Sequence, residues 1–547
     1  MSTLLSDSIR DFTADGLWHA WPEERFVTTL APSLRHEELL QNLKALASRY
    51  PEDIQLEEIG QSFLGRSIQM LTLGVGDNSI MLWSQMHGDE PSATPALLDI
   101  ADYLLANSDQ AAIRSILENY TLLIIPMLNP DGAEAWDRRN AQGIDINRDA
   151  LQLVTPEGRL LKRVRDGYEP MLGLNLHDQN RMTTVGDTGR LATCSVLAVS
   201  GDAENSLTRG RLRTKRACAA IVEALTPFIP GGIARYDEDW SPRAFGDNIT
   251  AWGTPVVLIE TGGFPAGLDV TDLTRLNFVA ILTVLLGLAD DDLAAYDPKV
   301  YEGIPENQTD SWSDFVVRGG FVMQPGTMEA FRSDFAFNIL RSGRQAVEGS
   351  GQNRIPSQIF LLGDASCHGA GTSVNAHGKV LLATFDVGVK GLSEYHWMDQ
   401  GNLSRLAQMG VGTIYWAVSE ADYSVALKHA GTYAVLGLPR IEVLVDASRF
   451  PKLTFAGPPP HARSASISAT LEALGVGNMP ASRAFDALWM APADGVTSPP
   501  RLCKDQPASF LMVSSTADGQ IDFANGSLIS VWLDGHLVVR NGSELRL

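Results

Sequence analysis

The sequence is poor in cysteine and in basic side chains, and each shortage excludes a class of protein. Four cysteines in 547 residues are too few for a disulfide framework, and none forms a CxxC pair, so we interpret them as buried thiols of a reducing compartment. The 43 basic side chains are outnumbered by 65 acidic ones, which gives a net charge of −22. Because a phosphate backbone binds to faces rich in Lys and Arg, this balance argues against nucleic acid and anionic membranes as partners.

Long apolar runs and targeting segments are also scarce. The longest apolar stretch, from Phe278 to Ala289, is shorter than the roughly 20 residues that cross a bilayer, so we expect a buried helix there. The first residues contain acids and lack the apolar core of a signal peptide. We therefore expect a soluble, cytoplasmic protein with no membrane partner.

What the chain does have is enough length and apolar content for two or three domains. With 44% apolar and 20% charged residues, the composition excludes a disordered chain. From about Glu37 to Leu288 the sequence alternates short apolar runs with helical patterns. This predicts that residues 1–295 form an α/β domain with a mainly parallel mixed sheet and helices on both faces. Pro and Gly in residues 296–310 predict a linker, and residues 311–547 predict a β-rich C-terminal domain of unknown role.

The predicted elements of the first domain follow from periodicity and turn residues. Predicted strands are Ile68–Leu73, Ile80–Met86, Thr121–Leu128, Met171–Leu176 and Pro255–Ile259, and predicted helices are Leu39–Tyr50, Ala93–Leu105, Arg211–Ala224 and Val270–Leu288.

Three of these strands run into residue types that bind metals. The predicted strand Ile80–Met86 is followed by His87 and Glu90. Met171–Leu176 is followed by His177, and Pro255–Ile259 by Glu260. Sites form at the carboxyl ends of parallel strands, so these side chains are expected to meet. Two histidines and one glutamate around an open position suit catalytic zinc.

Several short motifs then carry a resemblance to a known family. They occur in one order along residues 37–290 and comprise Gly60-Gln-Ser-Phe-Leu-Gly-Arg66, His87-Gly-Asp-Glu90, Asn129-Pro-Asp-Gly132, Arg138 to Arg148 with its Asp145-Ile-Asn-Arg148 block, His177 and Glu260. In this order they resemble the zinc carboxypeptidases of the carboxypeptidase A type.

The resemblance implies a metal centre and a catalytic pair. His87, Glu90 and His177 would hold one zinc per chain, and Glu260 would be the general base. Arg138 would stabilise the oxyanion of the tetrahedral intermediate, although Arg139 could align there instead.

The resemblance also implies the substrate, a peptide or small amide with a free C-terminal carboxylate. Asn147 and Arg148 would bind that carboxylate, with the arginine expected to be buried. Arg66 resembles an outer substrate-binding arginine, for which a structural salt bridge is the alternative. Tyr236 is the nearest candidate for the mobile tyrosine of the family.

Two further expectations concern the surroundings of these groups. Asp145 resembles the acid that orients a zinc-bound histidine, again with a structural salt bridge as the alternative. Arg243 and Asp247 lie in the stretch that would set the side-chain preference, so a charged C-terminal residue is conceivable and the preference stays open.

Three alternatives remain at this point. A zinc-dependent deacylase of N-acyl amino acids would share the same residues, and a non-catalytic zinc or peptide-binding module would keep only the binding groups. The ends of the C-terminal half, Asp314–Gly326 and Val531–Arg540, resemble the small β-sandwich that flanks amidohydrolase barrels, so this half could be a degenerate domain of that kind. No His-x-His pair follows residue 290, which argues against amidohydrolase chemistry. The oligomeric state is not predicted.

Overall fold

The computed structural model describes most of the first 323 residues and separate segments of the rest. The described residues are 12–265, 267–291, 293–323, 331–339, 357–375, 379–383, 385–390, 411–417, 433–438, 441–446, 510–514, 528–533, 536–540 and 543–544. The chain divides into two compact units, and the boundary between them along the sequence lies between Trp312 and Ser313.

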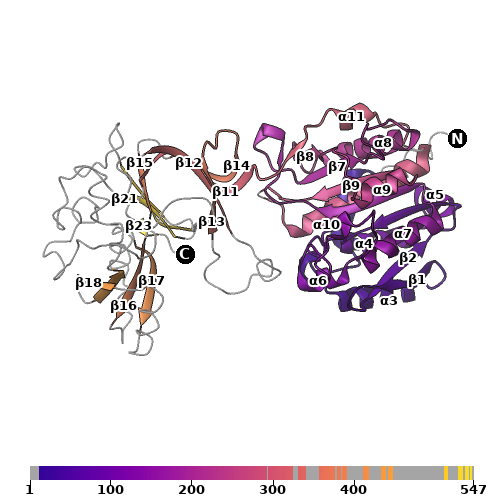
Figure 1. Cartoon of the computed structure of the whole chain (residues 1–547). Coiled ribbons are helices and arrows are strands. Elements are labelled where there is room, and N and C mark those ends of the chain that lie inside the picture. Colours follow the sequence, from indigo (N-terminus) through magenta and orange to yellow (C-terminus); the bar gives the residue numbers. More distant parts are fainter. Residues whose placement is uncertain are drawn as a thin grey trace. The chain divides into compact units, whose positions relative to one another are not determined.

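The first unit is built on an eight-stranded mixed sheet (Figure 1) with the order β1-β2-β4-β3-β5-β9-β7-β8. Its strands are β1 (Ile54–Gln61), β2 (Ser67–Leu73), β3 (Asn78–Trp83), β4 (Tyr120–Ile125), β5 (Leu172–Asp178), β7 (Cys194–Ala198), β8 (Ile233–Arg235) and β9 (Val256–Thr261). The central strands β4, β3, β5 and β9 are parallel, whereas β2 on one side and β7 on the other pair antiparallel with them. The predicted mainly parallel mixed sheet is confirmed.

Alternate side chains of the strands enter two different cores. Ile80 and Leu82 of β3 pack with α4, α8 and α10 in the larger core, while Met81 and Trp83 pack with α7 and α9 in the other. Because side chains alternate across a strand, these two cores mark the two faces of the sheet. The helices are α2 (Ala14–Glu24), α3 (His36–Arg49), α4 (Ala93–Ala106), α5 (Ala111–Asn119), α6 (Pro130–Ala135), α7 (Pro156–Tyr168), α8 (Arg209–Leu225), α9 (Phe245–Ala251) and α10 (Val270–Asp291). Helices therefore cover both faces, as predicted.

The longest helix, α10, extends beyond the apolar run seen in the sequence. Its 22 residues are long and apolar enough to cross a membrane by length and composition, but 78% of its most apolar window is buried within the structure. Leu276, Ile281 and Leu285 are fully buried in the larger core. The helix therefore packs as a core element, as the sequence indicated.

The segment predicted as a linker has structure of its own. It contains α11 (Pro298–Glu302), whose Tyr301 is fully buried and donates its hydroxyl to Glu238 Oε1 at 3.2 Å. Strand β10 (Asn307–Gln308) then pairs with β6 (Thr184–Val185). This segment therefore packs on the first unit, because it buries a large aromatic side chain there. The Pro and Gly content on which the linker prediction rested did not reveal this burial.

The described part of the second unit consists of strands. They form a nine-stranded sheet and a four-stranded sheet, which agrees with the expected β-rich region. The strands are β11 (Trp312–Met323), β12 (Phe331–Ile339), β13 (Ser357–Gly363), β14 (Gly369–Asn375), β15 (Lys379–Ala383), β16 (Phe385–Lys390), β17 (Val411–Ala417), β18 (Tyr433–Leu438), β19 (Ile441–Asp446), β20 (Phe510–Ser514), β21 (Leu528–Leu533), β22 (His536–Arg540) and β23 (Ser543–Glu544). The pair β21–β22 is antiparallel. The resemblance to an amidohydrolase sandwich stays a prediction.

Candidate metal centre

A tight turn after β3 presents the first two candidate ligands, His87 and Glu90. The strand ends at Trp83, earlier than predicted, because Gln85 adopts a left-handed conformation with φ of 48°. The side-chain amide of Gln85 then donates to the carbonyl of Gly88 at 2.9 Å. A Cβ on Gly88 would lie only 1.9 Å from the carbonyl carbon of Gly132, so the turn needs glycine to pack against the start of α6.

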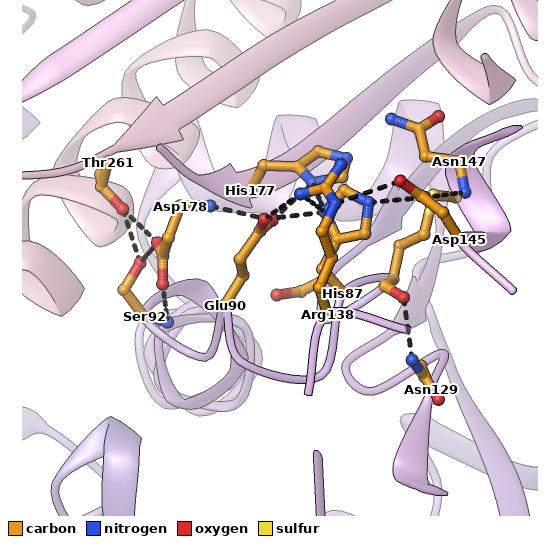
Figure 2. A network of polar contacts seen from close by, with 12 residues as sticks. His87, Glu90, Ser92, Asn129, Arg138, Asp145, Asn147, His177, Asp178 and Thr261 are labelled. Atoms are coloured by element: carbon orange, nitrogen blue, oxygen red, sulfur yellow. Dashed lines mark hydrogen bonds and ion pairs between the residues drawn. The ribbon is translucent and has the colours of Figure 1, made fainter. Parts of the chain in front are cut away.

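His177 joins these two side chains from the end of β5. Its Nδ1 lies 2.7 Å from Glu90 Oε2 and 3.1 Å from His87 Nδ1, while His87 Nδ1 lies 2.8 Å from Glu90 Oε1. All three side chains are buried, and Figure 2 shows them converging. Ligand atoms placed tetrahedrally at about 2.0–2.1 Å from zinc are separated by roughly 3.3 Å. The two ring nitrogens and the carboxylate therefore fit one zinc ion in chemistry, and their separations are somewhat shorter than those of a tetrahedral zinc site.

Asp145 lies against the second ring nitrogen of His87. Its Oδ1 is 3.1 Å from His87 Nε2, so a His87 ring that binds a metal through Nδ1 would donate its Nε2 hydrogen to Asp145. Burial raises the pKa of Asp145, but the hydrogen bond from His87 and the nearby cationic charges outweigh burial, and the pKa lies below its ordinary value. Asp145 is therefore placed where an acid that orients a metal-binding histidine must lie.

Arg138 lies against the three candidate ligands. Its Nε donates to Asp145 Oδ2 at 3.1 Å, and its Nη1 donates to Glu90 Oε1 at 3.0 Å. Arg139, by contrast, is exposed and donates to the carbonyl of Gly143. It does not line the cavity that contains His87, Glu90 and Arg138. The structure therefore brings Arg138, and not its neighbour, to the metal centre.

Glu260 occupies the matching position on the next strand. It is the register partner of His177 in the parallel pair β5–β9, and it lines the same cavity as His87 and Arg138. Burial, followed by the negative charges of Glu90 and Asp178, raises the pKa of Glu260 well above its ordinary value. A raised pKa makes this carboxylate a better proton acceptor than an ordinary exposed glutamate.

A buried hydrogen-bond network behind the metal centre was not foreseen from the sequence. Asp178 accepts hydrogen bonds from the amide of Ser92 at 3.0 Å, from the Ser92 hydroxyl, and from the Thr261 hydroxyl at 2.5 Å (Figure 2). The backbone amide of Asp178 donates to Glu90 Oε2 at 3.2 Å. Burial raises the pKa of Asp178 to about 6. The network joins the ends of β5 and β9 to the start of α4. Its signal in the sequence is proximity to the candidate site residues, since Asp178 and Thr261 each directly follow one and Ser92 lies two residues beyond another.

Three further predicted residues lie around a cavity of about 950 Å³. Asn147, Arg148 and Tyr236 line it together with Glu260. Arg148 is exposed and donates to the carbonyl of Asn147 at 2.7 Å, so the expectation of a buried arginine is wrong, because the short turn that carries it lies at the rim. The charge of Glu260, followed by burial, raises the pKa of Tyr236 above its ordinary value, which places the phenol close to the candidate base.

Arg66 does not reach the cavity. It is absent from the lining residues, and its Nη1 donates to Asp131 Oδ1 at 2.6 Å. The carboxylate of Asp131 is fully buried and also accepts from Ser62 Oγ and from the amide of Leu64, each at 2.9 Å. The salt-bridge alternative describes the position of Arg66 in the structure, and its contact with a substrate stays a prediction.

The fold and this geometry define a class of site. Two imidazoles and a carboxylate converge at the carboxyl edge of a mixed α/β sheet, and a separate glutamate and an arginine face the same cavity, as in metal-dependent hydrolases.

Comparison with known proteins finds a family match for part of the chain. Residues 39–159 match the family model described as zinc carboxypeptidase, so the resemblance inferred from the motifs is confirmed for this segment. It contains His87, Glu90, Arg138, Asn147 and Arg148, whereas His177 and Glu260 lie beyond it and are brought to the site by the structure.

Individual relatives are similar to short parts of the chain. Carboxypeptidase M of Mus musculus is 31% identical over 123 residues, which are 19% of this chain and 28% of the relative. A probable carboxypeptidase 2 of Trichophyton verrucosum (strain HKI 0517) is 28% identical over 132 residues, 22% of this chain and 25% of the relative. The chain thus matches about a quarter of the length of these relatives.

Solved structures show a partial likeness. A metallo-carboxypeptidase from Pseudomonas aeruginosa, solved in complex with (2-guanidinoethylmercapto)succinic acid, has a TM-score of 0.38 and 20% identity, over 46% of this chain and 69% of its own. The carboxypeptidase A from Helicoverpa armigera has a TM-score of 0.38 and 16% identity, over 52% of this chain and 80% of its own.

Proposed function

We propose that the protein is a zinc-dependent metallocarboxypeptidase that hydrolyses the C-terminal amide bond of peptides. The observation that carries this proposal is the convergence of His87 Nδ1, His177 Nδ1 and the Glu90 carboxylate, all within 4.8 Å of one another, beside Glu260 in one cavity. His87, Glu90 and His177 would hold one zinc per chain. The ion would supply Lewis-acid polarisation of the scissile carbonyl and lower the pKa of a water molecule towards about 7.

The side chains around that centre have separate tasks. Glu260 takes the proton of the attacking water and passes it to the leaving amine, for which a buried carboxylate of raised pKa is suited. Arg138 stabilises the negative charge that develops on the carbonyl oxygen, because its guanidinium lies against the candidate ligands and beside the cavity. Asp145 keeps His87 in the required tautomer.

The proposed substrate carries a free carboxylate. Arg148 and Asn147 line the cavity, and the planar guanidinium of Arg148 offers paired donors to a planar anion. Tyr236 lies on the same cavity, close to Glu260, where its hydroxyl can donate to the bound peptide. The cytoplasmic location expected from the composition belongs to the same proposal.

The experiment is a comparison of Glu260→Gln with Glu157→Gln in zinc-loaded protein. Glu157 is a fully buried carboxylate that accepts from Phe63 N and Asn140 Nδ2, away from the cavity lining. We expect Glu260→Gln to keep zinc and lose peptide turnover by roughly 10²–10⁴-fold, because the amide cannot accept the proton. Glu157→Gln should keep turnover.

Two outcomes would contradict the proposal. Full activity of Glu260→Gln would show that another base acts. Cleavage of N-acetyl amino acids by the wild-type protein, with no cleavage of peptides, would establish the deacylase alternative.

A further inference from the structure

The cavity has an inner recess one step below the metal centre. Asn175 on β5, Leu258 on β9 and Leu197 on β7 are register partners across three neighbouring strands. Each lies two residues from the row that holds His177 and Glu260, so its side chain points to the same face of the sheet. Two residues of a parallel strand span about 6.6 Å. The row of Asn175, Leu258 and Leu197 therefore lies about that far below the row of His177 and Glu260. All three side chains line the cavity.

The recess is closed below and at the side. Trp83, the register partner of Asn175 on β3, is fully buried. A Cβ added to Gly173 would lie 3.0 Å from the Trp83 ring, so the indole fills the next row down. A Cβ added to Gly246 of α9 would lie 3.4 Å from Asn175 Nδ2 and 3.7 Å from Val199 Cγ1. Gly246 and Val199 therefore form the wall beside the amide, and the depth is limited to about one row.

The floor of the recess carries a buried amide oxygen that no described residue bonds to. Asn175 is only 2% exposed, and its Oδ1 has no hydrogen-bond partner among the described residues. A buried acceptor left unpaired is costly, and the cost is recovered when a ligand brings a donor to it. Its register neighbours are Trp83 on one side and Leu258 on the other, with Leu197 one strand further. The floor therefore combines one hydrogen-bonding group with apolar surface and no charge.

Charged groups of the cavity lie outside this row. Asp237, Asp239 and Arg243 are exposed lining residues. Asp247 accepts from the amide of Ser241 at 2.8 Å, and burial raises the pKa of its carboxyl to about 6. A cationic or anionic side chain in the recess would therefore meet no opposite charge at the floor, and burying it there is unfavourable.

We propose that this recess receives the side chain of the C-terminal residue of the substrate, and that Asn175 selects neutral side chains of medium length that hydrogen bond, with glutamine and asparagine as the best fit. A carboxamide both donates to Asn175 Oδ1 and accepts from Asn175 Nδ2, while its methylene groups contact Leu258 and Leu197. The cationic side chains of lysine and arginine would find no carboxylate among the residues of this row. This inference rests on the proposed function, because it assumes that the scissile bond lies at the metal centre.

The test uses two peptides of identical body that end in glutamine or in methionine, which are nearly equal in shape. The zinc-loaded wild-type chain should cleave the glutamine peptide with a kcat/KM about tenfold to a hundredfold higher, because only this side chain satisfies the buried amide. Asn175→Leu should reverse the ratio. Asn175→Ser keeps a hydrogen-bonding group and should retain part of the preference, so the inference stays testable if the leucine variant fails to fold.

The matched control is Thr193→Val. Thr193 Oγ1 is also buried and without a partner among the described residues, but it does not line the cavity. This variant should leave the ratio of the two kcat/KM values unchanged.

Binding of the same peptides to the zinc-loaded Glu260→Gln chain, measured by calorimetry, separates the two proposals. Tighter binding of the glutamine peptide without cleavage of either peptide by the wild-type chain would refute the proposed function and support the recess. Equal kcat/KM and equal affinity for both peptides would overturn the inference and leave the proposed function standing. A preference for peptides ending in lysine would also overturn it, since Asp247 would then set the specificity.

Discussion

Asp145→Asn tests how strongly the surroundings of the metal centre set its affinity. The carboxylate accepts three hydrogen bonds, from His87 Nε2 at 3.1 Å, Asn147 N at 2.9 Å and Arg138 Nε at 3.1 Å. An asparagine side chain has a single acceptor oxygen, so its NH2 group must face at least one of these N–H donors. The loss of one charge-assisted bond is worth about 1.5–3 kcal/mol. Because the bond to His87 orients a ligand, we expect zinc affinity to fall by roughly 10–100-fold.

The assay is a competition titration of zinc against a chromophoric chelator at fixed pH, with Asp131→Asn as the control. Asp131 likewise accepts three hydrogen bonds, one of them from Arg66, but it does not line the cavity. Asp131→Asn should lower the thermal stability and leave the zinc affinity unchanged. Wild-type affinity in Asp145→Asn, or an equal loss of affinity in both variants, would refute this reasoning.

Two more outcomes are expected. Amidation of the substrate's C-terminus should lower kcat/KM by about tenfold in the wild-type chain, a modest loss because Arg148 is exposed and its charge is partly screened. The same amidation should change kcat/KM little in Arg148→Gln, which has already lost the guanidinium. An equal loss in both would show that Arg148 does not bind the carboxylate. Burial raises the pKa of Asp99 from 3.8 to about 7 against the hydrogen bonds from Trp21, Phe26 and Val27, so the folded chain holds a proton that the unfolded chain has released between these pH values. The wild-type Tm should therefore fall relative to that of Asp99→Asn as pH rises from 4 to 7, and parallel Tm curves would contradict the assignment.

The sequence predicted most of the central strands and the convergence of the candidate metal ligands because both leave local signals. Apolar runs such as Ile80–Met86 end in polar residues, and that change marks the edge of a parallel sheet. The order of His87, Glu90, His177 and Glu260 then limits the chemistry to a few classes.

Other features depend on contacts between distant segments and left no local signal. The short strand β7 was not predicted, since its apolar residues find their place only by pairing antiparallel with β9. The predicted end of β5 at Leu176 was two residues too early, because the ladder with β9 continues through His177 and Asp178. Arg66 matched a motif, yet the buried carboxylate of Asp131 holds it away from the cavity.

The exposure of Arg148 and the unpaired amide of Asn175 belong to the same group. Each depends on how the turn or strand that carries it packs against the rest of the first unit. Neither property can be inferred from neighbours in the sequence, so both appear only once the chain is folded.

The zinc content of the purified full-length chain, measured by elemental analysis after dialysis against a weak chelator, tests the central claim most directly. We expect one zinc per chain in the wild-type protein and in Glu260→Gln, and none in His87→Ala or His177→Ala, because each histidine supplies one of three ligands. Absence of zinc from the wild-type chain after loading, or one zinc per chain in both histidine variants, would contradict the account.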